Sequence, residues 1–485
     1  MDTRLVDEAL FEVPEEKPTA PAPAKGLVDK TFRSYDRGQQ FLLPPSIADW
    51  VPEGHLARFV DELVEEVLDL GPFYCSYTES RGYPPYDPRL MVKLLLYGYP
   101  VTGIRSSRGI EKACGDSVAF RYLCANVAPD FRSIARFRRR HLDALRSLFL
   151  ESLKLCQQAG MVRLGQVALD GTKRRADASR AKAMSYKKMA ESEQRLQREV
   201  DDLLADAERM DRREDEAFGE NGRDEDLDRE LARRETRLAK IRRAKADLEA
   251  DARDKAAARA AAKADNKGAN DEEAARAAEQ ARETASPEDK AQRNFTDRDS
   301  RVMKTNDGSF HYCYNAQTVV DDAHHVIVAT RLDNVSADSP AFADMLDEVI
   351  ANCGRAPGQV LADAGYFSAD NVTAATQRHI DPLIATGRLH HGEEVPAAPR
   401  GPIPKDATPK QRMARKLRTK AGKAAYARRK AIVEPVFGQM DVVQGAKHLL
   451  LRGSAAADAE WQLLAACHNL RKLFVVKGTA KIAPS

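Results

Sequence analysis

Residues 164–173 read LGQVALDGTK, and residues 358–368 read GQVLADAGYFS. In each stretch a short apolar run ends at an aspartate, Asp170 or Asp363, and a glycine follows within two residues. Apolar runs bounded by turn residues predict strands, here strands that end at the two aspartates. Because ligands of open α/β sheets collect outside the carboxyl ends of strands, we expect the two carboxylates to face each other.

Two carboxylates at such an edge are suited to holding divalent cations. Mg²⁺ prefers carboxylate oxygens. A pair of such cations suits phosphodiester chemistry, since one activates water or a 3′-hydroxyl and the other stabilises the leaving oxygen. Aspartates are also common as helix N-caps and turn residues, so position alone leaves that structural interpretation open.

A third carboxylate is expected from a helix that packs near both strands. Glu434, in YARRKAIVEPVFGQM, lies on an apolar-spaced stretch and follows the bases Arg428, Arg429 and Lys430. These bases can bind phosphates. A simple ion pair with one of them is the alternative explanation of Glu434.

Charge is segregated along the 485 residues, although the formal net charge is only +3. Residues 1–70 hold 7 Lys/Arg and 15 Asp/Glu, a local charge of −8. Residues 101–154 hold 11 basic and 5 acidic residues (+6), and residues 401–448 hold 12 and 3 (+9). Two distant basic regions predict a polyanionic partner that is contacted at two places. Solvated helix faces are the alternative.

Several classes of protein are excluded by composition. No stretch approaches the roughly 20 apolar residues that span a bilayer, and the acidic amino terminus lacks the apolar segment of a secretory signal. The seven cysteines are scattered, with no C-x-x-C pair. A zinc site or disulfide framework is therefore not expected, and a reducing cytosol is the natural compartment.

The pattern divides the chain into four parts. Residues 1–34 are predicted to be a disordered acidic tail. Residues 35–160 read as a mostly helical, helix-turn-helix-like DNA-binding domain, which includes one long helix over 134–156. Strand patterns mark residues 161–182 and 294–478 as one α/β domain with a mixed sheet; in it a basic loop, 401–423, precedes the helix of Glu434.

The remaining part, residues 183–293, is rich in Ala, Glu, Arg, Asp and Lys. Apolar residues recur every seven positions from Met189 to Met210, and a second run extends from Leu227 to Leu248. Two heptad runs around a Gly/Asn turn predict an antiparallel helical hairpin inserted into the α/β domain. The stretch after it is too polar and too rich in alanine to be predicted as ordered.

Many motifs in order resemble one family, the DDE transposases of bacterial insertion sequences. The motifs are FLLPPSIADWVPEGHLARFVDELV, YDPRLMVKLLLYGY, GIRSSRGIEKAC, PDFRSIARFRRRH, LDGTK, NFTDRDSRVMK, YNAQTVVD, VLADAGY and KAIVEPVFGQM. The resemblance covers the chain from about Tyr35 to Leu473. It implies a ribonuclease H-like catalytic domain, interrupted by the helical hairpin and preceded by the helical domain.

The resemblance also implies the site. Asp170, Asp363 and Glu434 match the catalytic, metal-binding DDE residues, which would hold two Mg²⁺ (or Mn²⁺) ions per active site. The partners implied are double-stranded DNA, as terminal inverted repeats and target, and a second copy in a homodimer. The location implied is the bacterial cytoplasm, at the nucleoid, with no membrane partner. The DNA-binding residues expected are Arg132, Arg136, Arg138, Arg139 and Arg140 in the helical domain, and Tyr426, Arg428, Arg429, Lys430 and Lys447 near Glu434.

The chain departs from the family pattern at one position. A lysine is expected two turns after the glutamate, but Asp441 stands there, and the nearest basic residue beyond it is Lys447. The main hypothesis is a transposase that cleaves at the element ends and joins the 3′-hydroxyls to target DNA. The alternatives are a catalytically decayed or regulatory DNA-binding descendant and a nuclease of the same fold.

Overall fold

The computed structural model describes residues 46–78, 84–218, 225–265, 270–387, 398–399, 401–404 and 406–478. Residues Ile47–Ser485 form one compact unit, separate from Met1–Ser46. The predicted tail over residues 1–34 lies outside the described residues. Within the described ranges, no helix combines the length and the apolar character needed to cross a bilayer.

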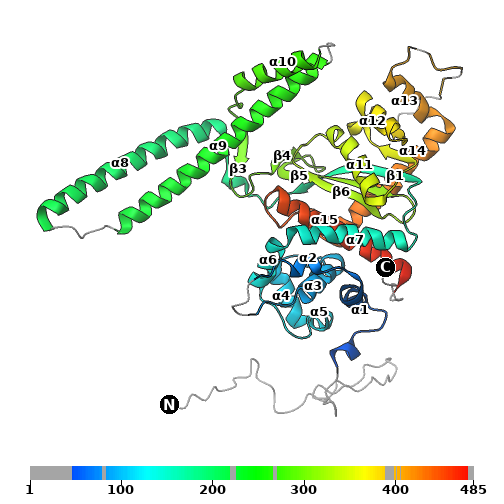
Figure 1. The fold of residues 1–485 in the computed structure, drawn as a ribbon, viewed down its shortest axis with the longest axis horizontal. Helices are drawn as coiled ribbons and strands as arrows, with labels where there is room; N and C mark the ends of the chain where they lie inside the picture. The colour runs from blue at the N-terminus through cyan, green and yellow to red at the C-terminus, as the bar shows by residue number, and fades with distance from the viewer. Residues whose placement is uncertain are drawn as a thin grey trace, which may run out of the picture. The chain divides into compact units, whose positions relative to one another are not determined.

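The first part of the described chain is helical (Figure 1). Its α-helices are α1 Leu56–Glu62, α2 Gly71–Tyr74, α3 Pro88–Thr102, α4 Ser107–Asp116, α5 Val118–Leu123, α6 Phe131–Arg140 and α7 Leu142–Gln158. Helix α3 begins at Pro88, with Asp87 as its N-cap. Helix α1 begins at Leu56 because His55, whose side chain accepts from the Ala57 amide, is the N-cap.

The prediction of one long helix over residues 134–156 is wrong, because two helices, α6 and α7, meet there at His141. This residue leaves the helical conformation, with φ −112° and ψ 37°. Its ring is buried and lies 4.4 Å from the Phe137 ring and 5.4 Å from the rings of Phe73 and Tyr77, measured between centroids. The aromatic contacts therefore hold His141 inside, and α7 leaves in a new direction.

A six-stranded mixed sheet forms the centre of the second part. Its strands are β1 Gln166–Arg175, β4 Arg301–Lys304, β5 Phe310–Asp321, β6 Ile327–Asp333, β7 Gln359–Ala362 and β8 Asp381–Ile384. The order is β4-β5-β1-β7-β8, and β6 shares the outer edge of β5 with β4. Strand β5 is antiparallel to its neighbours, whereas β1, β7 and β8 are parallel. Strands β5 and β6 follow each other in the chain and form an antiparallel hairpin.

Strand β1 does not end at Asp170, as the sequence analysis expected, but continues to Arg175. The reason is that its two neighbours have different lengths. Parallel pairing with β7 stops at Leu169, whereas antiparallel pairing with β5 extends from Val167 to Arg175. Asp170 therefore lies inside a strand, at the position where one partner strand stops.

Helices cover both faces of the sheet. Alternate residues of a strand point to opposite faces. On one side, Arg174 contacts α14 (Lys420–Val442) and α15 (Ser454–Lys477). On the other, Lys173 contacts Asp338, which precedes α11 (Phe342–Cys353). Helix α15 also packs along α7, so the carboxyl-terminal helix joins the sheet to the helices of the first part.

The basic segment 401–423, expected to be a loop, contains a helix. Helix α13 spans Pro409–Arg418, with a capping box between Thr408 and Gln411, and α14 follows after Thr419. Helix α12, Ala369–Gln377, links β7 to β8. A T-x-x-Q capping box with proline at the first turn is a local helix signal, so α13 was recognisable from the sequence.

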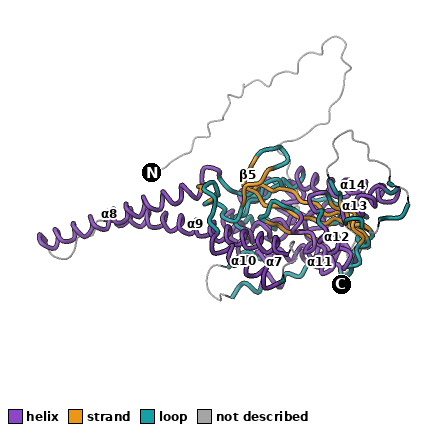
Figure 2. Tube along the Cα trace, turned by 90° about the horizontal axis from the view of Figure 1, so that it is seen from above, coloured by secondary structure: helices purple, strands orange, loops and turns teal. Residues whose placement is uncertain are grey.

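Three helices lie between β2 (Ala183–Ser185) and β3 (Gln292–Asn294), which pair with each other. They are α8 Tyr186–Phe218, α9 Glu225–Asp265 and α10 Asp271–Thr284. Helices α8 and α9 run antiparallel, since Tyr186 bonds to Glu249 and Glu193 bonds to Arg242 (Figures 1 and 2). The heptad residues of both bury a small core, namely Met189, Leu196, Leu238, Ile241 and Leu248. The Ala-rich stretch continues α9 and, after the gap at 266–269, forms α10.

Candidate active site

Asp170 and Asp363 lie side by side on neighbouring strands. The last parallel pair of β1 and β7 is Leu169 with Ala362, and each aspartate is the next residue in its chain. Adjacent strands are about 4.8 Å apart, so the two backbones bring the carboxylates into one place. Asp363 also caps the short 3-10 helix Ala364–Tyr366, as its Oδ1 accepts from the Gly365 amide at 2.8 Å.

The surroundings of Asp170 raise the pKa of its carboxyl group. Burial raises the pKa of Asp170 to about 6, Arg429 opposes the rise, and the negative charge of Asp363 adds to it. The Nη1 of Arg429 donates to Asp170 Oδ2 at 3.1 Å. Two like charges in a half-buried place are stabilised by a cation, and in this structure the guanidinium of Arg429 supplies it.

Helix α14 brings Arg429 and Tyr426 to this pair, because they lie on its inward side with Val433 and Val436. Tyr426 is half-buried, and burial raises the pKa of its hydroxyl, with Asp363 and Asp170 adding to the effect. Glu434 is exposed on the same helix and, in the described part of the chain, forms no hydrogen bond or ion pair. Its neighbour Val433 is fully buried, so the helix turns Glu434 away from the core.

The three predicted carboxylates therefore do not form one group in this structure. Among the described residues, no cluster of three or more His, Cys, Asp or Glu side chains is placed to hold a metal ion. The chemistry of Asp170 and Asp363 fits such an ion, since both offer carboxylate oxygens and their like negative charges repel each other.

A further aspartate, which the sequence analysis did not single out, supports the strand beside Asp170. Asp338 Oδ1 accepts from Asn315 Nδ2 at 2.7 Å, from Gln317 Nε2 at 3.0 Å and from Lys173 Nζ at 3.1 Å. A Cβ atom on Gly171 would lie 2.6 Å from the same oxygen. The absence of a side chain at Gly171 is thus needed for the close approach of Asp338. The expectation that the chain turns at this glycine is wrong, because β1 continues through it.

Asp338, Asp170 and Asp363 all act on one buried side chain. Tyr366 is fully buried, and its hydroxyl donates to Gln317 Oε1. Burial raises its pKa well above the ordinary value, and the charges of the three aspartates raise it further. Asp338 follows the end of β6 by five residues, whereas Asp363 directly follows β7. An aspartate in the loop after a strand was the signal that could have found Asp338.

Asp441, where the family pattern has lysine, pairs with Arg174. Arg174 is 1% exposed, and its guanidinium lies 5.5 Å from the Phe437 ring centroid and 5.0 Å from that of Trp461. Burial lowers the pKa of Arg174, and the charge of Asp441 opposes this. The departure at position 441 thus has a structural role, because it neutralises a buried cation four residues along β1 from Asp170.

The predicted DNA-binding residues fall into exposed and engaged groups. On α6, Arg132, Arg136, Arg139 and Arg140 are exposed. Arg138 is buried and donates to Tyr99 Oη at 3.0 Å and to the Arg105 carbonyl at 2.8 Å, so it holds the helices together.

On and after α14, the predicted bases are exposed except for Arg429, which is half-buried. Lys430 and Lys447 have exposed side chains. Arg428 is exposed and pairs with Asp322 at 2.8 Å. Only Arg429, of the bases predicted near Glu434, faces the two aspartates directly. The others face solvent, where a polyanion can reach them.

Comparison with known families supports a role on DNA. Residues 279–470 match the transposase DDE domain, and residues 45–140 match a transposase domain (DUF772). The first match includes Asp363 and Glu434, the second includes α6, and Asp170 lies between the two. No curated protein and no solved structure matches the chain.

The two domains define an enzyme that acts on DNA. The DDE domain implies a ribonuclease H-like fold, and the mixed sheet described above is compatible with it. The chain belongs to the DDE transposases of insertion sequences.

Proposed function

We propose that this transposase binds the terminal inverted repeats of its element, cleaves phosphodiester bonds there and joins the 3′-hydroxyl ends to target DNA. Asp170, Asp363 and Glu434 are the proposed catalytic residues, and Mg²⁺ or Mn²⁺, two per site, the proposed cofactor. The observation that carries the proposal is the placement of Asp170 beside Asp363, with Arg429 balancing their charge.

Asp170 and Asp363 would hold the cations, whose chemistry is to activate an attacking oxygen and to stabilise a leaving one. Arg429 pairs with Asp170 in this structure. If a bound cation neutralised Asp170, the guanidinium would be available for a DNA phosphate, for which its planar donors are suited. Glu434, exposed on the same helix, would complete the carboxylate set as α14 adjusts.

Exposed bases mark where the DNA backbone would run near the active site. On α13 and α14 the exposed cations include Lys410, Lys420, Lys423 and Lys430. Arg132, Arg136, Arg139 and Arg140 form a second basic surface, on α6. Phosphate contacts of this kind position DNA without reading its sequence. Two such surfaces suit an enzyme that must hold an element end and a target.

The proposed organisation assigns these surfaces to separate parts. Residues 35–160 form the DNA-binding domain, residues 161–182 and 294–478 form the catalytic domain, and residues 183–293 form a helical insert. Two element ends must be joined in one event, so we propose a homodimer. The heptad-bearing helices α8 and α9 are a candidate for contact with the second copy.

The test is cleavage of a labelled duplex that carries the element's own end, in Mg²⁺ and in EDTA. Nicking at the junction in Mg²⁺ alone, lost in Asp170→Asn and in Glu434→Ala while duplex binding persists, is the expected result. Asp177→Asn, which changes a partly exposed aspartate outside the site, is the matched control and should cleave as the wild type does.

Other outcomes separate the alternatives. Cleavage that survives Asp170→Asn would refute the assigned site. Cleavage without joining to a target duplex would identify a nuclease of the same fold. Binding without cleavage in any divalent metal would identify a decayed or regulatory descendant.

A further inference from the structure

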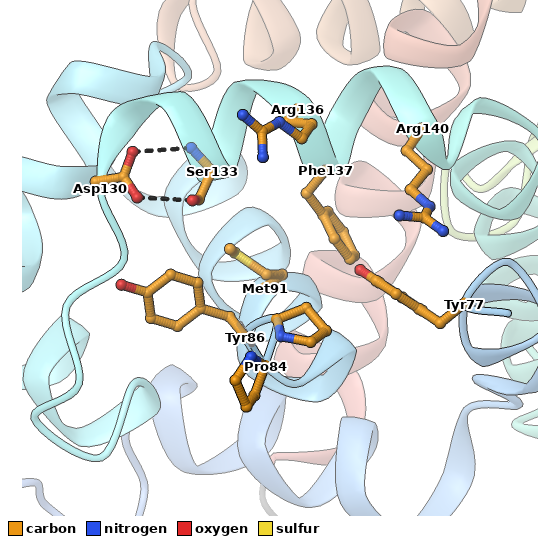
Figure 3. A pocket seen from close by; sticks show the side chains of 10 residues that line it. Tyr77, Pro84, Tyr86, Met91, Asp130, Ser133, Arg136, Phe137 and Arg140 are labelled. Atoms are coloured by element: carbon orange, nitrogen blue, oxygen red, sulfur yellow. Dashed lines mark hydrogen bonds between the residues drawn. The ribbon is translucent and has the colours of Figure 1, made fainter. Parts of the chain in front are cut away.

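A cavity of about 570 Å³ lies between α6 and the segment that leads into α3 (Figure 3). Tyr77, Tyr86 and Phe137 are among its lining residues, as are Arg136 and Arg140. Cavities of roughly 300–1,000 Å³ are typical of small-molecule sites. The size therefore suits one planar group together with a charged substituent.

Two of the aromatic walls, Phe137 and Tyr77, are held in place by further contacts. Phe137 is buried and stacks on Phe73, with ring centroids 5.7 Å apart and an interplanar angle of 2°. The Tyr77 hydroxyl lies 3.2 Å from His141 Nε2, and the Arg140 guanidinium lies 4.3 Å above the Tyr77 ring. Figure 3 shows Phe137 extending from α6 towards Tyr77, with Tyr86 on the side of the cavity opposite α6. Rings fixed in this way favour a flat ligand.

The charge at the rim favours an anion. Arg136 is exposed and, among the described residues, makes no hydrogen bond or ion pair. The one carboxylate of the lining, Asp130, is already engaged, because it accepts from the amides of Arg132 and Ser133 and from the Ser133 hydroxyl. These hydrogen bonds lower the pKa of Asp130. A ligand phosphate would therefore meet Arg136 as an unpaired cation.

We propose that this cavity binds an unpaired nucleotide of DNA, with its base against Tyr77, Tyr86 and Phe137 and its phosphate on Arg136. The inference rests on the proposed function, since it places DNA along the basic surface of α6. Aromatic side chains and arginine planes are the groups on which proteins stack unpaired bases. The nucleotide has two sources, namely a single-stranded overhang or a base turned out of a duplex.

The experiment measures the Kd of the full-length protein for a 12-nucleotide thymidine oligomer and for a blunt duplex. Base stacking supports a loss of about 5- to 150-fold in oligomer affinity when an aromatic partner is removed. We expect a loss in this range for Tyr86→Ala. Tyr86→Leu, which keeps the apolar bulk in case the alanine variant unfolds, should show a smaller loss. Arg136→Ala should weaken oligomer binding more than duplex binding.

Arg139→Ala is the matched control, because Arg139 is an exposed arginine of α6 that has no partner within the described part of the chain and does not line the cavity. It should weaken oligomer and duplex by the same factor. Oligomer binding by Tyr86→Leu and Arg136→Ala at the wild-type Kd would overturn the inference while duplex binding upholds the proposed function. Failure of the wild type to bind either DNA would overturn both.

A duplex that carries 2-aminopurine distinguishes the two sources. A rise in fluorescence on binding, absent in Tyr86→Leu, identifies a base turned out of the duplex. If fluorescence stays unchanged while a duplex with an overhang binds more tightly than a blunt one, the nucleotide comes from the overhang. If neither effect is seen, the inference is wrong.

Discussion

Replacing Asp441 by asparagine removes the charge that pairs with a buried guanidinium. Arg174 is 1% exposed, and within the described chain its Nε and Nη2 have no hydrogen-bond partner. Its remaining favourable contacts are the faces of Phe437 and Trp461. The asparagine variant keeps the shape of the side chain, so the change isolates the charge.

The expected magnitude follows from burial. Removing one partner of a buried ion pair costs about 3–5 kcal/mol. The Asp441 side chain is 23% exposed, so water replaces part of the lost interaction. The two aromatic faces also retain part of it, at about 0.5–2 kcal/mol each. We therefore expect Asp441→Asn to lower the free energy of unfolding by about 2–3 kcal/mol.

Urea unfolding at neutral pH measures the loss. The matched control is Asp177→Asn, which breaks the exposed ion pair with Arg452 and should cost at most about 1 kcal/mol. The double variant Asp441→Asn with Arg174→Met removes both charges and should recover most of the lost stability. Asp441→Lys should destabilise more than Asp441→Asn, because it places a second cation beside Arg174.

Two results would refute this reasoning. An equal loss for Asp441→Asn and Asp177→Asn would show that burial of Arg174 does not set the cost. A double variant no more stable than Asp441→Asn would show that the unpaired charge is not its cause. If the prediction is confirmed, the departure from lysine at position 441 is explained by a structural ion pair, and it gives no sign of decay.

Three further predictions concern the site and its support. Gly171→Ala should cost about 1–3 kcal/mol, because its Cβ would lie 2.6 Å from Asp338 Oδ1, while Gly165→Ala, with open space around it, should be near neutral in thermal unfolding. The pKa of Asp170 is raised to about 6, so the folded state binds the extra proton between about pH 4 and pH 6. The free energy of unfolding should therefore fall by up to about 3 kcal/mol as pH rises through this window, and Asp170→Asn should flatten this pH profile of stability. A pH profile of stability that is unchanged in Asp170→Asn would contradict the assignment of the raised pKa to Asp170. Mg²⁺ binding, measured by calorimetry, should weaken below pH 6. Glu460→Gln should cost about 3–5 kcal/mol in urea unfolding, since it leaves the buried Arg105 without its carboxylate; a loss below 1 kcal/mol would show that the pair is not stabilising.

Local patterns account for much of the fold. The apolar runs before Asp170 and Asp363 predicted two strands, and the structure places these runs in β1 and β7, paired in parallel. The hairpin of β5 and β6 was recognisable from two apolar runs around a short turn. The same is true of the helix that begins at Pro88, since proline and an aspartate cap mark its start. Each of these features depends on residues that are neighbours in the chain.

The features of the site divide in the same way, into those indicated by the sequence and those decided by tertiary structure. Local strand patterns indicated Asp170 and Asp363, whereas Tyr426 and Arg429 were indicated by the resemblance to the DDE transposases. Tertiary structure decided that β1 runs on to Arg175, since only pairing with β5 extends it.

Tertiary structure also decided the state of the remaining groups. It placed Arg138 inside, Asp338 behind Gly171, and Asp441 on Arg174. The Asp338 and Asp441 contacts join residues more than a hundred positions apart, and even Arg138 reaches back over thirty residues to the carbonyl of Arg105. Burial and pairing of a charge depend on which distant segments pack around it, and a local pattern carries no information about that.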